Sequence, residues 1–273
     1  MDIGLIDYFA NSGRSFLHRA SAIQKIIFVV FILASVVVTK DLLLLLSIYL
    51  VLAALVILTR LPFFKIISIA AYPAVFGLLF AAASWNGSWI RSGVIVLKAL
   101  SAALSMVLLI VTTPYPRVFA AINPFLPKVV VEGLFLTYRS LFILLELMGN
   151  LIRALRVRGG LSPGRYIKNI INFSSGIGLL LIRGIDLSEK FYGVMKIRGY
   201  SGKMVEEGEK EFSRQDLIPV ATGFLVFVLS VALSFENDFS RYHLVVLSVS
   251  LLFVLIAVSY VYFYEDRGIS WKS

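Results

Sequence analysis

Two four-residue segments with the same chemistry lie forty residues apart in the sequence. Residues 156–159 read Arg-Val-Arg-Gly and residues 196–199 read Lys-Ile-Arg-Gly. Each has a basic residue, a β-branched apolar residue, an arginine and a glycine. The planar guanidinium of arginine suits an acidic or carbonyl-rich groove, because it donates parallel hydrogen bonds. The chemistry is recognition rather than catalysis, and two copies predict two similar binding sites on a partner.

Each segment is predicted to end a helix. Glycine commonly terminates helices, and a basic side chain near that end is favoured by the helix dipole. One Arg-Gly pair therefore indicates no more than an ordinary helix end, whereas two such pairs on the same stretch of chain indicate a motif. Gly159 and Gly199 would end the helices and leave Arg158 and Arg198 exposed. The candidate partner-contacting residues are Arg156, Val157, Arg158 and Gly159 (the first motif) and Lys196, Ile197, Arg198 and Gly199 (the second motif).

Other chemistry is poorly represented. The chain has no cysteine and two histidines, His18 and His243, which cannot form a histidine-rich metal site. Residues 159–166, GGLSPGRY, lack the Gly-Lys-Ser/Thr ending of a phosphate-binding loop. No Ser/His/Asp or Cys/His set can be assembled. We therefore expect no catalytic, cofactor or metal site, and a protein that is not an enzyme.

The composition is that of an integral membrane protein: 59% of the 273 residues are hydrophobic and 15% are charged. The spans contain almost no carboxylates, which argues against a self-contained proton-driven carrier. Lys98 lies in the fourth span, and we expect it to extend to the membrane surface. The sequence predicts an all-α, polytopic helix bundle of about six spans, at residues 23–39, 42–58, 66–84, 93–113, 217–235 and 244–263.

The distribution of charge predicts the orientation. The net charge is +10, and 15 of the 26 basic residues lie between the fourth and fifth spans. The positive-inside rule places this segment and both termini in the cytosol, facing anionic lipid; nucleic acid is a poor partner because no soluble basic domain stands apart. The predicted organisation is a cytosolic N-terminal segment (1–22), spans one to four (23–113), a cytosolic helical domain (114–216), spans five and six (217–264) and a cytosolic tail (265–273).

The inserted domain is predicted to contain two helices, at residues 129–157 and about 175–197, separated by GGLSPGRY. Leu144, Met148, Leu151 and Leu155 share one face of the first helix. Both helices are too apolar to lie bare in water and too charged to span a membrane. We expect them to lie at the membrane surface, or to pack on each other and on a partner.

With these motifs, the chain resembles the T component of energy-coupling-factor transporters, the CbiQ/EcfT family. The resemblance is most specific from residue 138 to 202, in YRSLFILLE (138–146) and MKIRGYSG (195–202). The N-terminal stretch IDYFANSGRSFLHR (6–19) is similar to the opening of cobalt-type members, which continue with Asp-Pro where this chain has Ser21-Ala22. Val157 and Ile197 also stand where the family often has alanine.

The resemblance implies a membrane helix bundle with a cytosolic coupling domain. Two ABC-type ATPases would dock at the motifs, and the spans would pass their motion to a separate membrane-embedded, substrate-binding S component. Cobalt or nickel ions are the expected substrate, and a vitamin stays open. Two readings of another class also stay open: a stand-alone membrane protein whose basic helices bind anionic lipid, or a facilitative carrier.

Overall fold

The computed structural model describes residues 10–11, 13, 15–59, 61–85, 87–161, 164–200, 217–235 and 240–265. Within these ranges every regular element is a helix, which confirms the all-α prediction. The chain divides into two compact units, Met1–Val118 with Glu209–Ser273 (unit 1) and Phe119–Gly208 (unit 2). Half of the predicted N-terminal segment and nearly all of the predicted C-terminal tail lie outside the described residues.

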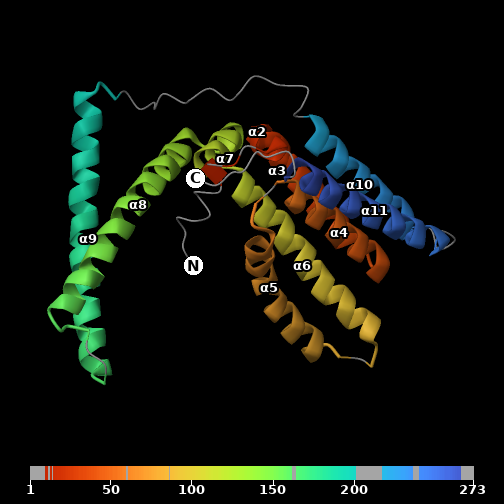
Figure 1. Ribbon diagram of the computed structural model, residues 1–273. Helices are drawn as coiled ribbons and strands as arrows, with labels where there is room; N and C mark the ends of the chain where they lie inside the picture. The colour runs from red at the N-terminus through yellow and green to blue at the C-terminus, as the bar shows by residue number, and fades with distance from the viewer. Residues whose placement is uncertain are drawn as a thin grey trace. The chain divides into compact units, whose positions relative to one another are not determined.

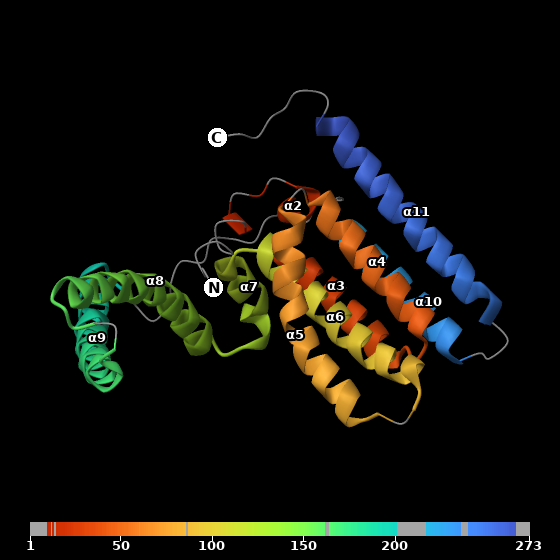
Figure 2. The ribbon, with the colours of Figure 1, turned by 60° about the horizontal axis from the view of Figure 1, so that its bottom comes forward.

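Unit 1 contains the long apolar helices. Helix α4 packs against α6 and α11, α3 packs against α6 and α10, and α5 packs against α6. The C-terminal helices α10 and α11 thus join a bundle that the first four long helices form (Figures 1 and 2). The elements are α2 (Phe16–Arg19), α3 (Ala22–Val38), α4 (Leu42–Leu58), α5 (Phe63–Ala83), α6 (Trp89–Thr112), α10 (Leu217–Phe235) and α11 (Ser240–Glu265).

The six predicted spans are all helices, with three starts misplaced. Helix α11 begins at Ser240 rather than at residue 244. Helix α5 begins at Phe63 rather than at residue 66, because Pro62 suits the position before a first helical turn. Helix α6 begins at Trp89 rather than at residue 93, and its first turns include Arg91. Four helices in the described ranges are long and apolar enough to cross a membrane: α5, α6, Leu244–Val261 of α11 and α9 (Tyr166–Ile197). The prediction that both helices of the inserted domain are too charged to span is therefore wrong for α9 by length and composition. Helices α3 and α4 and Leu217–Leu233 of α10 are apolar but shorter, so the count of six spans stays a prediction.

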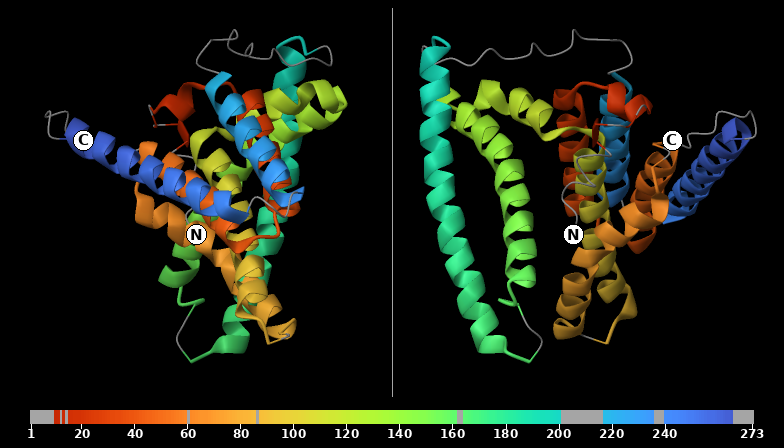
Figure 3. Two further views of the ribbon diagram at one scale, coloured as in Figure 1. Left: turned by 90° about the vertical axis from the view of Figure 1, so that its right-hand side faces the viewer. Right: turned by 60° about the vertical axis from the view of Figure 1, so that its left-hand side comes forward.

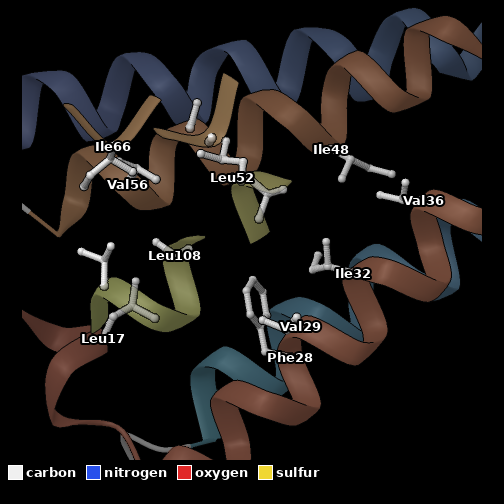
Figure 4. Packing of buried hydrophobic residues seen from close by; sticks show 14 of the residues in the cluster. Leu17, Phe28, Val29, Ile32, Val36, Ile48, Leu52, Val56, Ile66 and Leu108 are labelled. Carbon is white, nitrogen blue, oxygen red and sulfur yellow. The ribbon is translucent and has the colours of Figure 1, made fainter. Parts of the chain in front are cut away.

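The core of unit 1 lies where α3, α4, α5 and α6 meet. Ile32, Leu45, Leu52 and Leu104 are almost completely buried there. In Figure 4 the side chains of Ile32 in α3 and Leu52 in α4 point into the same interior of the helix bundle. Helix α4 carries the leucine run LLLLLSIYLVLAALVIL and is buried on several sides, because it lies between α6 and α11. An apolar helix of this kind belongs in the interior of a bundle.

Small residues let the helices of unit 1 approach closely. A Cβ atom at Gly223 of α10 would lie 2.9 Å from Cδ2, 3.2 Å from Cα and 3.3 Å from the carbonyl oxygen of Phe28 in α3. A Cβ atom at Gly77 of α5 would lie 3.0 Å from the Cβ atom of Ala99 in α6. Close backbone approach at glycine and alanine is typical of helices that pack within a membrane.

Two lysines link α6 to the two ends of α3. Lys25, buried near the start of α3, donates to the carbonyl of Thr112 (2.9 Å) and the hydroxyl of Thr113 (3.1 Å) at the end of α6. In return Lys98 of α6 donates to the carbonyl of Val37 in the last turn of α3 (2.9 Å). A helix leaves its last carbonyls without partners, and a cation there is favoured by the dipole. The ammonium group of Lys98 thus binds a carbonyl at the C-terminal end of α3. We had expected this side chain only to extend to the membrane surface.

Unit 2 is built around a helix pair. Helix α7 (Tyr115–Ile122) leads from unit 1 into it, followed by a 3-10 turn (Asn123–Phe125), α8 (Lys128–Val157) and α9 (Tyr166–Ile197). Helix α8 is curved, and α9 lies along it with the opposite chain direction (Figures 1 and 3). Helix α9 starts nine residues before the predicted residue 175, because the loop's turn-forming residues end at Gly164 and Arg165 and the chain can turn helical at once. Unit 2 falls within the segment predicted to be cytosolic, and its compartment stays a prediction.

Candidate partner-binding ends of α8 and α9

The first motif ends α8 in a tight, hydrogen-bonded turn. Arg158 is the last near-helical residue, and Gly159 has φ +69°. The amide of Gly159 donates to the carbonyl of Arg156 (3.1 Å), and the amide of Gly160 donates to that of Leu155 (2.8 Å). These two bonds define a Schellman motif, in which the glycine takes the left-handed conformation. The turn therefore fixes the backbone at Arg158 against its own helix.

The second motif ends α9 in the same way. Arg198 is again the last near-helical residue, and Gly199 has φ +77°. The amide of Gly199 donates to the carbonyl of Lys196 (3.1 Å), and the amide of Tyr200 donates to that of Met195 (3.0 Å). The sequence predicted that a glycine would end each helix, and both ends confirm it. Beyond that prediction, the two turns share one hydrogen-bond pattern, position for position.

The side chains of both motifs are exposed. Val157 and Ile197, the apolar residues before the arginines, are 89% and 88% exposed. The basic residues Arg156, Arg158, Lys196 and Arg198 are exposed as well. A fully exposed β-branched side chain beside a fixed arginine gains from being covered, because its burial removes apolar surface from water. Each motif thus offers an apolar and a cationic group to a partner.

A side-chain hydrogen bond from the other helix reaches the residue after each motif's glycine. Gly160 accepts from the amide nitrogen of Asn172 in α9 (2.8 Å). The hydroxyl of Tyr200 donates to a carboxylate oxygen of Glu132 near the start of α8 (2.5 Å). This bond to Glu132 is the main cause that raises the pKa of Tyr200 above its usual range. We call these two bonds the first tie and the second tie.

The sequence did not identify the ties. Glu132 and Tyr200 are 68 residues apart, and Gly160 and Asn172 are joined only once the loop and the start of α9 are placed. A local pattern carries no signal for such pairs. The one sequence feature near them is the tyrosine that follows the second Arg-Gly pair.

The two motifs lie at opposite ends of the α8 and α9 pair. The first lies beside the loop that connects the helices, and the second follows the far end of α9 (Figure 3). Helix α9 has 32 residues, so a rise of 1.5 Å per residue gives it a length of about 48 Å. The two exposed arginines therefore lie far apart on the helix pair.

The predicted apolar face of α8 points to α9. Leu144 and Met148 line an apolar groove of about 210 Å³ between the helices. Next to it, Leu151 packs on the buried Gly176 of α9, where a Cβ atom would lie 2.6 Å from the end of the leucine. Leu155 lies beside Gly160. The groove residues are Leu141, Leu144, Leu145 and Met148 of α8 with Ile177, Leu180 and Leu181 of α9.

Metal-ligating side chains do not gather in the part of the chain that the structure describes. No three His, Cys, Asp or Glu residues there come together as a metal site would require. His18 is buried and its Nδ1 lies 2.6 Å from the hydroxyl of Ser15. A Cβ atom at Gly13 would overlap its ring. His18 therefore has a packing role, and the side chain of His243 lies outside the described residues.

Helices of this length and composition are those of a multi-pass membrane protein. Residues 13–208, well over half of the chain, match the family model CbiQ, cobalt transport protein. The chain belongs to this family, as its resemblance to the CbiQ/EcfT proteins predicted. It is a cobalt-type membrane transport component of a kind that works in a complex and is generally not itself catalytic. No curated protein matches the sequence at a significant level.

Proposed function

We propose that the chain is the coupling subunit, or T component, of an ATP-driven energy-coupling-factor importer. Two ABC-type ATPase subunits dock on the first and second motifs, one on each. The spans pass the ATPase motion to a small S component in the membrane, which binds the substrate. The observation that supports this best is the pair of exposed Arg-Gly ends with the same Schellman geometry.

The geometry suits two equal sockets. Both turns fix an arginine against its helix end, and both place a β-branched side chain next to it in water. A socket with an apolar wall and acidic or carbonyl oxygens would match both groups. Two ATPases of one fold offer two such sockets, whereas a membrane surface has no need of a repeated turn.

Coupling requires that the two nucleotide states contact the motifs differently, because a ligand shifts a conformational equilibrium only through differential affinity. Movement of the sockets with the nucleotide would supply that difference. Helices α8 and α9 are long, and they place the two contact points far apart, so they act as levers on the spans. In this proposal unit 2 and both termini lie in the cytosol, as the concentration of basic residues between spans four and five favours.

The proposed substrate is a cobalt or nickel ion. The family description favours cobalt, and the opening of the sequence resembles cobalt-type members. The chain has no thiol with which to hold such an ion, so the S component would bind it. A vitamin substrate is the alternative, and it requires the same role of this chain.

The experiment that tests the proposal is copurification of the tagged chain with its partners from membranes in mild detergent. The wild-type chain is expected to retain one or two ABC ATPases and a small multi-span protein. Arg158→Glu or Arg198→Glu should release ATPase and reduce uptake, and the double variant most. Arg153→Glu and Arg183→Glu are matched controls, because these exposed arginines lie on the same helices outside the motifs. Normal uptake by the double variant would contradict the coupling role.

A second candidate function is lipid binding by unit 2 in a stand-alone membrane protein. It draws on the exposed apolar side chains Ile167, Ile170 and Ile171 of α9, a helix long enough to cross a membrane. Lipid attraction depends on charge alone, so Arg158→Lys with Arg198→Lys would keep it. Socket binding depends on the guanidinium, and the same change would weaken it. Binding to vesicles with and without anionic lipid, set beside ATPase copurification, separates the two.

A further inference from the structure

The residue that follows each motif is held by the opposite helix, and this arrangement recurs at both ends of the α8 and α9 pair. Gly160 follows the first motif and accepts from Asn172. Tyr200 follows the second motif and donates to Glu132. The two residues occupy the same position in the two Schellman turns, where each amide closes the turn on its own helix. One residue at each end therefore belongs to the turn and to the tie at once.

We infer that Asn172 and Glu132 are positioning residues, each of which sets the direction of the motif arginine at its own end of the pair. This inference rests on the proposed function, since it concerns the arginines that would dock the ATPases. The Schellman turn fixes Arg158 and Arg198 only against their own helices. The ties fix the turns against the neighbouring helix, which is what a partner that contacts both ends would detect.

Packing between α8 and α9 is too open to do this alone. In the described part of α9 the only buried residue is Gly176, and the middle of the interface is an apolar groove. Helices with so few buried contacts can slide or splay at their ends, which are the least stable parts of a structure. A hydrogen bond at each end limits that motion at the place where the motif lies.

The two ties differ in chemistry. The first joins a neutral amide to a backbone carbonyl. The second joins a hydroxyl to a carboxylate, and a hydrogen bond to a charged acceptor is about twice as strong as a neutral one. We therefore expect the second motif to be held more firmly than the first.

The test is a set of double variants measured in the assembled complex, with the affinity of the ATPases for the membrane-reconstituted chain as readout. Asn172→Asp keeps the shape of the side chain and removes its amide donor, and Tyr200→Phe removes the hydroxyl. Each should weaken docking about 3- to 10-fold. Asn172→Asp should have no further effect once Arg158→Ala is present and its full effect with Arg198→Ala. Tyr200→Phe should show the reverse pattern.

Equal losses in both arginine backgrounds would overturn the inference, because a general loss of folding does not distinguish the two ends. Glu132→Gln offers a rescue control, since its amide oxygen still accepts from Tyr200, whereas Glu132→Ala does not. We expect docking to be retained in the first variant and weakened in the second. Equal weakening by both would also overturn the role of the tie.

A second measurement does not depend on the ATPases. The chain has no cysteine, so pairs of spin labels can be attached at introduced cysteines without background. Val129→Cys with Val194→Cys reports on the second tie, and Arg153→Cys with Ile167→Cys on the first, because all four positions are exposed. Tyr200→Phe should broaden only the former distance distribution and Asn172→Asp only the latter. Unchanged distributions would overturn the inference, whereas normal docking by both arginine variants would overturn the proposed function alone.

Discussion

Two helix pairs in this protein are each joined by hydrogen bonds at two separate points, but the packing between those points differs. In unit 1 the lysines Lys25 and Lys98 join α6 to the two ends of α3. In unit 2 Asn172 and Tyr200 join α9 and α8 at opposite ends. Between its ties the first pair lies against the core of unit 1. Between its ties the second pair has an open groove.

The arrangement of two helices can be determined by buried packing along their length or by hydrogen bonds near their ends, and the two pairs differ in this respect. Many buried contacts determine how α3 lies on α6, so the lysine bonds add to an arrangement that packing already favours. Few buried contacts determine how α8 lies on α9, so its two ties carry a larger share of the geometry. A unit of this kind can change shape at low cost, which suits the coupling role that we propose for it.

The largest expected effect on stability comes from a glycine-to-alanine change in unit 1, compared with the same change in unit 2. Gly223→Ala places a Cβ atom 3.2 Å from the Cα atom of Phe28, where backbone cannot move aside. Gly176→Ala places one 2.6 Å from a terminal methyl of Leu151, which can turn into free space beside the groove. We expect Gly223→Ala to reduce the free energy of unfolding by about 3 kcal/mol and Gly176→Ala by much less, although its contact is closer. Denaturant unfolding in detergent measures both, and equal losses would contradict the contrast.

The next effect separates the two lysines of unit 1. Lys25→Met leaves the carbonyl of Thr112 and the hydroxyl of Thr113 without this donor in a buried place, and we expect a loss of about 2 kcal/mol. Lys98→Met removes one bond from a partly exposed site, so its loss should be smaller. The midpoint of thermal unfolding in detergent orders the two variants. A larger shift for Lys98→Met would mean that burial does not determine the strength of these caps.

Much of the fold could be predicted because apolar length and helix-ending residues are local signals. All six predicted spans are helices, and Gly159 and Gly199 end α8 and α9 as expected. Starts were less certain. The start of α9 was predicted too late, because the polar and charged residues Lys168, Asn169 and Asn172 interrupt the apolar pattern although they lie within the helix.

The candidate site divides in the same way. The composition of the motifs was readable from the sequence, because each lies within four consecutive residues. The contacts that hold the motifs were not, since Tyr200 and Glu132 meet only when two long helices are placed side by side. Lys98 was recognised as a basic residue within a span, but its partner is a backbone carbonyl on another helix, which a sequence does not mark.

A smaller effect concerns the turns of unit 2. Gly159→Ala or Gly199→Ala forces a side chain into a left-handed conformation, at a cost of about 1 kcal/mol. The Schellman turn should open and ATPase docking should weaken. Gly164→Ala is the matched control: it has φ +85° and equally open surroundings, but it lies in the loop outside both motifs. Copurification of ATPase should fall for the first two variants and not for the third; a similar loss in all three would assign the effect to general strain.

The smallest effect separates the two ties by pH. The bond to Glu132 raises the pKa of Tyr200 above its usual value of 10.0. A raised folded-state pKa means that the contribution of this tyrosine to stability is complete below the unfolded value and is lost as the pH rises through the folded one. As the pH rises from about 10 through this raised pKa, the label distance across the second tie should broaden. The distance across the first tie should stay constant, because an amide and a carbonyl do not titrate there. Tyr200→Phe should abolish the pH dependence, and equal broadening at both ends would show that alkaline pH loosens unit 2 as a whole.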